Sequence, residues 1–412
     1  MKKNLVILDE FFPFLNKEPF LETEINFYNN CNVYIFACSA DSSMPYRKIK
    51  NKNIKFFAQK KEKSKLKKVF RYINAVFSVD FFKELLFLLR NKKFNLLRIK
   101  QLLSFLSISR YKYKWIKKEL VNLGINQNSN IIFYSYWMHF HAYTALLLKN
   151  DFKNSKVVTR CHGFDLYEYR NSLNYIPLRK KVLSNIDEIY SISEDGKSYL
   201  TENYPNIKMN IKVSKLGTID YGLMDEPGER NPLKIVSCSW VVPVKRLDRI
   251  INALQLINDI DIEWTHYGDG ELLDSIKNLA SLSLGNKTNI TYHFKGSISN
   301  QQILEDYLNE QYHLFINVSE SEGIPVSIME AISFGIPVIA PNVGGVKEIV
   351  VNNINGMLLA KDFTDDQLIN AIKWIADMSD SEYSNLRQST RKFWEDNYSA
   401  NKNYSTFIEN IV

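Results

Sequence analysis

The chain has 412 residues, which is long for a single hydrophobic core and predicts two domains. Apolar residues make up 45% of it while glycine and proline are sparse, so the composition excludes a disordered or fibrous protein. The net charge of +8 is unevenly distributed, because residues 47–118 alone hold 23 Lys and Arg against three acids.

The N-terminal apolar run, residues 5–8, stops at the acidic pair Asp9 and Glu10. It is too short for a signal peptide and predicts a first buried strand. No run approaches the ~20 apolar residues that a membrane span requires. The four cysteines have neither zinc-site spacing nor the density of a disulfide framework, which favours buried thiols in a reducing compartment. We therefore expect a cytoplasmic protein, either soluble or peripheral on the inner face of the cytoplasmic membrane.

Continuous apolar runs predict strands in two series along the chain. The first series lies at 5–8, 33–38, 131–134, 156–160, 188–192 and 211–214, and the second at 234–239, 263–267, 290–294, 314–318 and 338–340. Such runs are typical of parallel strands covered on both faces. Helical periodicity between them, as at 248–256 and 271–279, predicts an α/β protein of doubly wound domains.

The polar segment 220–232, with two Gly and two Pro, has the composition of a linker between the two series. We place the first domain at residues 1–220 and the second from residue 230. Ligands of open α/β sheets bind at the carboxyl ends of the strands, so we expect a site in a cleft between the domains.

The strongest signal follows the predicted strand 314–318. Gly323 and Pro325 open a helix whose first turn contains Ser327, and free amides at a helix N-terminus suit a phosphate. Glu322 precedes this helix and Glu330 follows eight residues later, so both lie on roughly one side of the element. Carboxylates suit sugar hydroxyls, which predicts a diphosphate flanked by a sugar and a ribose.

This segment resembles the E-x7-E motif of retaining GT-B glycosyltransferases, most closely family 4, and the resemblance continues through 334–340 and 343–350. It implies two Rossmann-like domains facing each other across a cleft. The N-terminal domain, 1–220, takes the acceptor, 230–385 binds the nucleotide sugar, and a closing helix at 386–412 crosses back to the N-terminal domain. Glu322 then holds donor-sugar hydroxyls and Glu330 the ribose diol. The sugar and distal phosphate contact the segment Gly323, Ile324, Pro325, Val326 and Ser327, whose non-proline residues offer backbone amides.

By the same resemblance, the loop after strand 234–239 carries two cations that neutralise the diphosphate. Lys245 matches one, whereas Trp240 stands where the other is expected, and the adjacent Arg246 is a candidate replacement. A cation there lowers the barrier because the leaving group gains charge. Gly268 and Gly296, each after a predicted strand, are expected to shape the pocket.

In the first domain, His162 follows strand 156–160 and matches a family histidine that faces the donor sugar. Asp165, Tyr136 and Trp137 are weaker candidates on the acceptor side. The loop Glu18-Pro19-Phe20, with Glu24, replaces the double glycine that the family often carries. Asp259-Ile260-Asp261 matches a metal-binding string of another fold, but it leads into a strand away from the site, so we expect neither a metal nor a cofactor.

The resemblance implies transfer of a hexose-type sugar, with retention of configuration, from a nucleotide sugar to a saccharide or lipid-linked saccharide in surface polysaccharide biosynthesis. A GT-B-like nucleotide-sugar epimerase is the alternative. Residues 47–118 mix cations with aromatic and aliphatic side chains, which fits either an anionic membrane surface or a solvated helical face over a core. A nucleic-acid-binding module has no recognised motif to support it, so we expect no nucleic-acid partner.

Overall fold

In a computed structural model the chain forms two units, and the structure describes residues 3–15, 18–49, 51, 53–60, 62, 64–223 and 228–412. The first unit comprises Met1–Lys215 and Tyr404–Val412, and the second Leu216–Asn403. Residues 224–227 of the expected linker, and four lysines of the basic segment (50, 52, 61 and 63), lie outside the described residues. Residues 386–403, expected in the closing helix, belong to the second unit.

The first unit is built on a seven-stranded parallel sheet of order β3-β2-β1-β4-β5-β6-β7. The strands are β1 (Lys3–Asp9), β2 (Cys31–Asp41), β3 (Ile54–Gln59), β4 (Ile131–Ser135), β5 (Ser155–Cys161), β6 (Glu188–Ser191) and β7 (Ile211–Val213). Alternate residues of β1 enter different cores, because side chains of a strand point to opposite faces. Val6 and Leu8 pack in one cluster, and Leu5 and Ile7 in the other.

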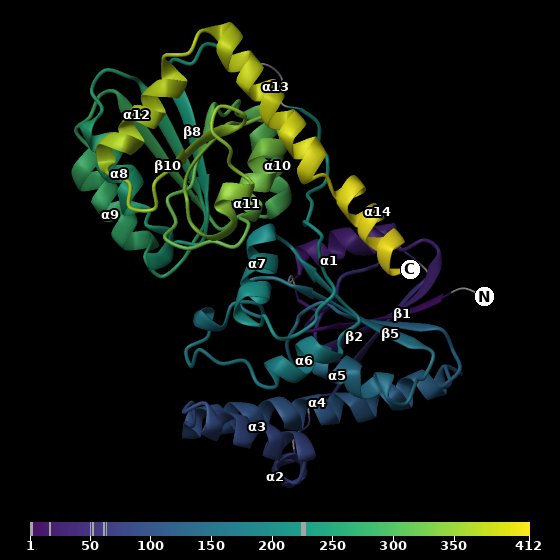
Figure 1. The fold of residues 1–412 in the computed structure, drawn as a ribbon. Helices are drawn as coiled ribbons and strands as arrows, with labels where there is room; N and C mark the ends of the chain where they lie inside the picture. The colour runs from purple at the N-terminus through teal and green to yellow at the C-terminus, as the bar shows by residue number, and fades with distance from the viewer. Residues whose placement is uncertain are drawn as a thin grey trace. The chain divides into compact units, whose positions relative to one another are not determined.

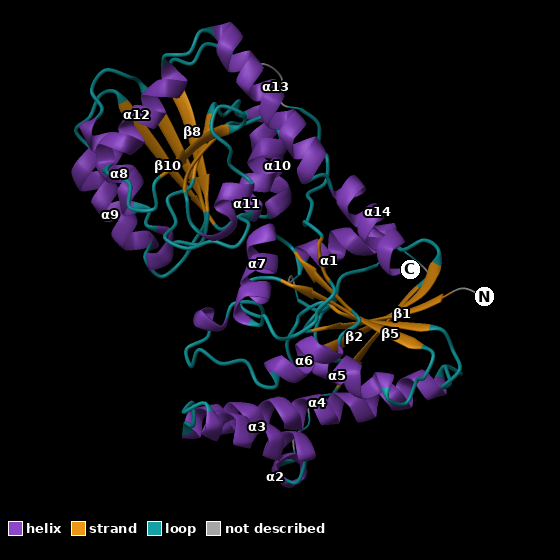
Figure 2. Ribbon diagram, in the orientation of Figure 1, coloured by secondary structure: helices purple, strands orange, loops and turns teal. Residues whose placement is uncertain are grey.

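Helices cover both faces of this sheet (Figures 1 and 2). They are α1 (Pro19–Glu24), α2 (Lys65–Val76), α3 (Val79–Arg90), α4 (Leu96–Asn122), α5 (Phe140–Lys149), α6 (Arg179–Asn185) and α7 (Glu194–Asn203). The long helix α4 buries Leu102, Phe105 and Leu106 in the core, so this part of the basic segment is a helical face over a core. Helix α14 (Ala400–Ile411) begins in the second unit and ends in the first, where Phe407 and Ile411 are buried.

The second unit has a six-stranded parallel sheet of order β10-β9-β8-β11-β12-β13. Its strands are β8 (Leu233–Cys238), β9 (Ile262–Tyr267), β10 (Ile290–Gly296), β11 (Leu314–Ile316), β12 (Val338–Pro341) and β13 (Gly356–Leu359). Its helices are α8 (Asp248–Leu256), α9 (Leu273–Leu284), α10 (Asn300–Asn309), α11 (Val326–Ser333), α12 (Asp365–Ala376) and α13 (Asp380–Asn397).

Both sheets confirm the doubly wound α/β prediction, and each predicted strand overlaps an observed one. The prediction missed β3 and β13, which are edge strands of their sheets. Among the described residues, no helix combines the length and the apolar character needed to cross a membrane.

Candidate functional site

The strand order of the second unit reverses beside β8. The chain passes from β8 to β9 and β10 on one side, and later places β11, β12 and β13 on the other. Ligands of open α/β sheets bind outside the carboxyl ends of the strands at such a point. The loops that follow β8 and β11 meet there, since the amide of Glu320 donates to the carbonyl oxygen of Val244 at 2.8 Å.

These two loops bring Lys245 and Glu322 into an ion pair. Lys245 Nζ lies 2.5 Å from Glu322 Oε1, and Asn317 Nδ2 donates to the same oxygen at 3.3 Å. The two paired side chains are 20% and 11% exposed, so the pair is partly desolvated yet accessible. Two residues predicted from separate motifs, 77 positions apart, therefore lie together at the switch point.

Arg246 is held by the β11 loop. Its backbone is left-handed, with φ of 49°, which directs its side chain differently from that of Lys245. The guanidinium donates from Nε to the carbonyl of Val318 at 2.9 Å and from Nη2 to that of Ser319 at 3.3 Å. Trp240, where the resemblance expects a cation, is 66% exposed. In this conformation Arg246 ties the two loops together, and its role toward a donor stays a prediction.

Helix α11 begins next to the ion pair with unshielded amides. Pro325 is its N-cap, and no side chain caps the first turn, so the amides that follow are available to an anion. Ile324 and Pro325 are buried, whereas Val326 and Ser327 keep partial exposure. The amide-rich segment predicted from the sequence therefore stands at the partly open end of the helix.

The loop before α11 is supported from one side and open on the other. The amide of Gly345 donates to the carbonyl of Gly323 at 3.1 Å, and a Cβ on Gly345 would lie 2.7 Å from that oxygen. A Cβ on Gly323 would meet nothing within 4 Å. The double glycine thus permits close packing behind the loop, while the space in front of Gly323 is unfilled by protein.

Glu330 is almost fully buried one helical turn further in. It accepts a hydrogen bond from Asn300 Nδ2 at 2.9 Å, and burial raises its pKa to about 7. Asn300 is the first residue of α10, after β10, and sequence reasoning missed it. Its position just after a strand and a Ser299 N-cap is the signal that marks it. A buried carboxylate with one amide partner is suited to accept hydroxyl hydrogen bonds.

Gly268 and Gly296 shape the carboxyl ends of β9 and β10. The amide of Gly268 donates to the carbonyl of Gly296 at 2.9 Å, and both have positive φ, 144° and 67°. A Cβ on Gly268 would lie 1.8 Å from the carbonyl oxygen of Ser239. Only glycine fits this approach, so Gly268 fixes the distance between the β8 loop and its neighbour.

In the first unit, His162 packs against the two aromatic candidates. Its ring centroid lies 4.9 Å from that of Tyr136 and 4.4 Å from that of Trp137. Both His162 ring nitrogens and Trp137 Nε1 are buried with no hydrogen-bond partner among the described residues. Unpaired buried donors and acceptors are costly, so this cluster is suited to receive a polar ligand.

Asp165 holds the backbone of this cluster in place. Its carboxylate accepts from the amide of His162 at 2.8 Å and from that of Met138 at 2.7 Å. His162 Nδ1 lies 3.8 Å away, too far for a hydrogen bond. Burial raises the pKa of Asp165, but the His162 ring and these amides lower it by more, so the net pKa is below its ordinary value. The geometry gives Asp165 a positioning role for the loops after β4 and β5.

The Glu18-Pro19-Phe20 loop leads to a buried ion pair. Glu24 Oε2 lies 2.6 Å from Arg160 Nη1, and both side chains are fully buried. Arg160 also stacks on Phe407 of α14, 4.1 Å from its ring centroid. Sequence reasoning missed Arg160, and its partners show that Glu24 anchors the core beneath α14.

Residues 225–393 match the family model described as Glycosyl transferases group 1. The match covers most of the second unit, Leu216–Asn403. The matched range contains the Lys245–Glu322 pair, Glu330 and the amide-bearing start of α11.

Curated relatives match longer stretches of the chain than the family model does. An uncharacterised glycosyltransferase of Methanocaldococcus jannaschii is 28% identical over 62% of this chain and 66% of its own length. The O-antigen biosynthesis glycosyltransferase WbnH of Escherichia coli is 28% identical over 60% of this chain and 68% of its own length. The matched regions thus span about two thirds of these relatives.

A solved structure aligns with the chain over both units. HepE of Anabaena, solved with UDP and glucose, aligns with a TM-score of 0.64 at 15% identity, covering 100% of this chain and 99% of that one. The chain therefore has the GT-B fold.

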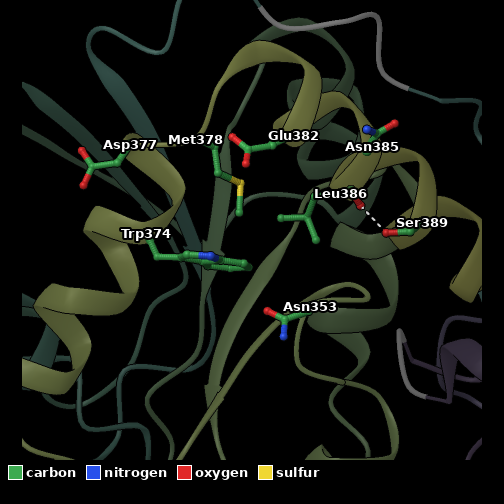
Figure 3. A pocket seen from close by; sticks show the side chains of 8 residues that line it. All are labelled: Asn353, Trp374, Asp377, Met378, Glu382, Asn385, Leu386 and Ser389. Atoms are coloured by element: carbon green, nitrogen blue, oxygen red, sulfur yellow. Dashed lines mark hydrogen bonds between the residues drawn. The ribbon is translucent and has the colours of Figure 1, made fainter.

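The second unit also carries a separate open pocket of about 680 Å³ (Figure 3). It lies between α12, α13 and the turn at Asn353, and is lined by Asn353, Trp374, Asp377, Met378, Glu382, Asn385, Leu386 and Ser389. None of the predicted site residues lines it. This pocket is therefore separate from the candidate site at the β8 and β11 loops.

Proposed function

We propose that the protein is a glycosyltransferase that moves a hexose-type sugar from a nucleotide sugar to a saccharide or lipid-linked saccharide acceptor. The observation that carries this proposal is the Lys245–Glu322 pair at the switch point, beside the uncapped start of α11. It offers a cation and free amides for a diphosphate and a carboxylate for sugar hydroxyls. The E. coli relative named for O-antigen biosynthesis supports an acceptor in surface polysaccharide synthesis.

We assign roles to single residues within this proposal. Lys245 neutralises the diphosphate, Glu322 binds donor-sugar hydroxyls, and buried Glu330 accepts from the ribose diol with Asn300 beside it. The backbone N–H groups between Gly323 and Ser327, except at Pro325, which has none, contact the sugar and distal phosphate. His162 of the first unit serves the donor sugar, because it is buried with unpaired ring nitrogens.

The reaction we propose retains the anomeric configuration. The bond between the anomeric carbon and the phosphate oxygen breaks, and the acceptor oxygen bonds to the same face of that carbon. The acceptor proton passes to the departing phosphate oxygen. Lys245 and the α11 amides stabilise the charge that develops on the leaving group, so the proposal requires neither a metal nor another cofactor. Activity unchanged by a chelator is the expected result.

The donor is tested first by thermal shift with UDP-, GDP- and ADP-sugars. A true donor stabilises the fold because it binds only the native state. HepE, solved with UDP-glucose among other ligands, makes UDP-sugars the first choice. Lys245→Gln should remove the shift, while Lys277→Gln, on the exposed side of α9, should keep it.

Product analysis separates transfer from the alternatives. NMR of the product should show the donor's anomeric configuration, and an inverted centre would refute the retaining mechanism. Incubation with donor alone distinguishes an epimerase, which would change the sugar without an acceptor. We place the enzyme on the cytoplasmic side as part of this proposal.

A further inference from the structure

Helix α2 presents an apolar stripe to solvent. Leu66, Val69, Phe70, Ile73 and Phe77, just after its end, recur at helical spacing, and their exposed fractions range from 45% to 76%. The opposite side contributes Ala75, which is fully buried in the core. The stripe is thus the outer face of a helix whose inner face already packs on the protein.

Helix α3 repeats this arrangement. Val79, Phe82, Leu86 and Leu89 are exposed by half or more, while Phe81 and Leu88 are buried. Both helices contact α4, and Figure 1 shows them on the side of α4 away from the sheet. Residues 66–97, which we name the α2–α3 surface, hold 13 of the 26 exposed large apolar side chains among the described residues. Such a concentration marks an interaction surface.

The charges around this surface are of one sign. Residues 65–100 contain ten Lys and Arg and two acids, Asp80 and Glu84. Asp80 is bound to Lys181 and Tyr143, and Glu84 is 9% exposed and accepts from Tyr175. Both acids therefore point into the fold, and eight of the ten cations are exposed.

We propose that the α2–α3 surface docks on an anionic lipid bilayer, with α2 and α3 lying in the interface. Apolar stripes flanked by cations bind such membranes by burying the apolar face while the cations contact lipid headgroups. A second copy of this chain is a poorer occupant, because it would oppose eight exposed cations with eight more. Lysine and arginine stems also reach from an apolar surface to headgroup level.

The test is flotation of the full-length protein with vesicles of phosphatidylcholine alone, or with roughly 30% phosphatidylglycerol to supply the negative surface potential. The protein should float with the anionic vesicles and stay behind with the neutral ones. The triple variant Phe70→Ser/Phe77→Ser/Phe82→Ser should lower the partition coefficient by about tenfold or more. The control Leu256→Ser/Leu282→Ser, on exposed sites of the second unit, should leave it unchanged.

Charge is tested by Lys67→Glu/Lys68→Glu, which should weaken binding, against Lys277→Glu/Lys361→Glu, which should not. Equal binding to neutral and anionic vesicles, or full binding by the triple variant, would overturn the proposal. So would a wild-type dimer that does not float and becomes monomeric in the triple variant, since that result assigns the surface to a second copy. The assay involves no sugar transfer, so its failure leaves the proposed transferase intact.

Discussion

Lys245 Nζ and Glu322 Oε1 lie 2.5 Å apart, at the junction of the two loops that follow β8 and β11. The pair places the cation beside the amides at the start of α11. If the proposed function is right, a diphosphate takes Lys245 as its partner and Glu322 then turns to the sugar hydroxyls. We therefore expect donor binding to replace the ion pair.

Neutralising either partner should slow transfer. Lys245→Gln removes the charge that stabilises the leaving group, and we expect kcat to fall about 100-fold, as for loss of one electrostatic contact. Glu322→Gln should mainly raise KM for the donor. Glu320→Gln, an exposed carboxylate of the same loop, is the control. In a double-mutant cycle the two effects should not add, because the residues share a contact. Strict additivity would contradict the pairing.

Glu330→Gln should raise the stability of the protein at pH 8 and lower its affinity for the donor. Burial raises the Glu330 pKa from 4.5 to about 7, so the folded state binds its proton more strongly than the unfolded state. Wild-type stability then falls as pH rises from about 4.5 to 7 and stays low above it. At pH 8 the variant should be more stable by up to roughly 3 kcal/mol, with little difference at pH 4. Donor affinity should fall, because an amide replaces an acceptor for the ribose. Thermal melts at both pH values, paired with donor titration, measure this.

Two glycines of the β11 site should respond in opposite ways. Gly323→Ala adds a Cβ into open space, so the melting temperature should stay unchanged while KM for the donor rises severalfold. Gly345→Ala places a Cβ 2.7 Å from the Gly323 carbonyl and should lower stability by about 1–3 kcal/mol through overpacking. Parallel melting and kinetic measurements compare them. If the Gly323→Ala enzyme keeps the wild-type KM, the donor does not occupy the space in front of Gly323.

Asp165→Asn should lower the stability of the first unit and leave the structure of the second unit unchanged. The amide offers one acceptor where the carboxylate oxygens receive two backbone N–H groups, so we expect a loss of roughly 1–3 kcal/mol. Because the folded-state pKa of Asp165 is lowered, its contribution is present above the ordinary value of 3.8 and is lost as pH falls through the lower folded value. Thermal melts from pH 7 downward measure this effect. The difference in stability between wild type and variant should become smaller only in strong acid.

The sequence by itself determined the two sheets and the motif after β11. Central parallel strands such as β1 and β8 are buried on both faces, so their apolar runs are visible without any tertiary information. It did not reveal β3, in which only Ile54 is buried, or β13, whose apolar run is only the three residues 357–359.

Only the tertiary structure decided which residues meet. Arg160 pairs with Glu24 across 136 positions, and Asn300 reaches Glu330 from another helix. Such contacts depend on strand order and loop path, which a local pattern does not encode. The basic segment, residues 47–118, also could not be resolved from its sequence. Cations and apolar residues are mixed throughout it, but packing on the sheet buries one side of α4 and leaves the outer faces of α2 and α3 in solvent.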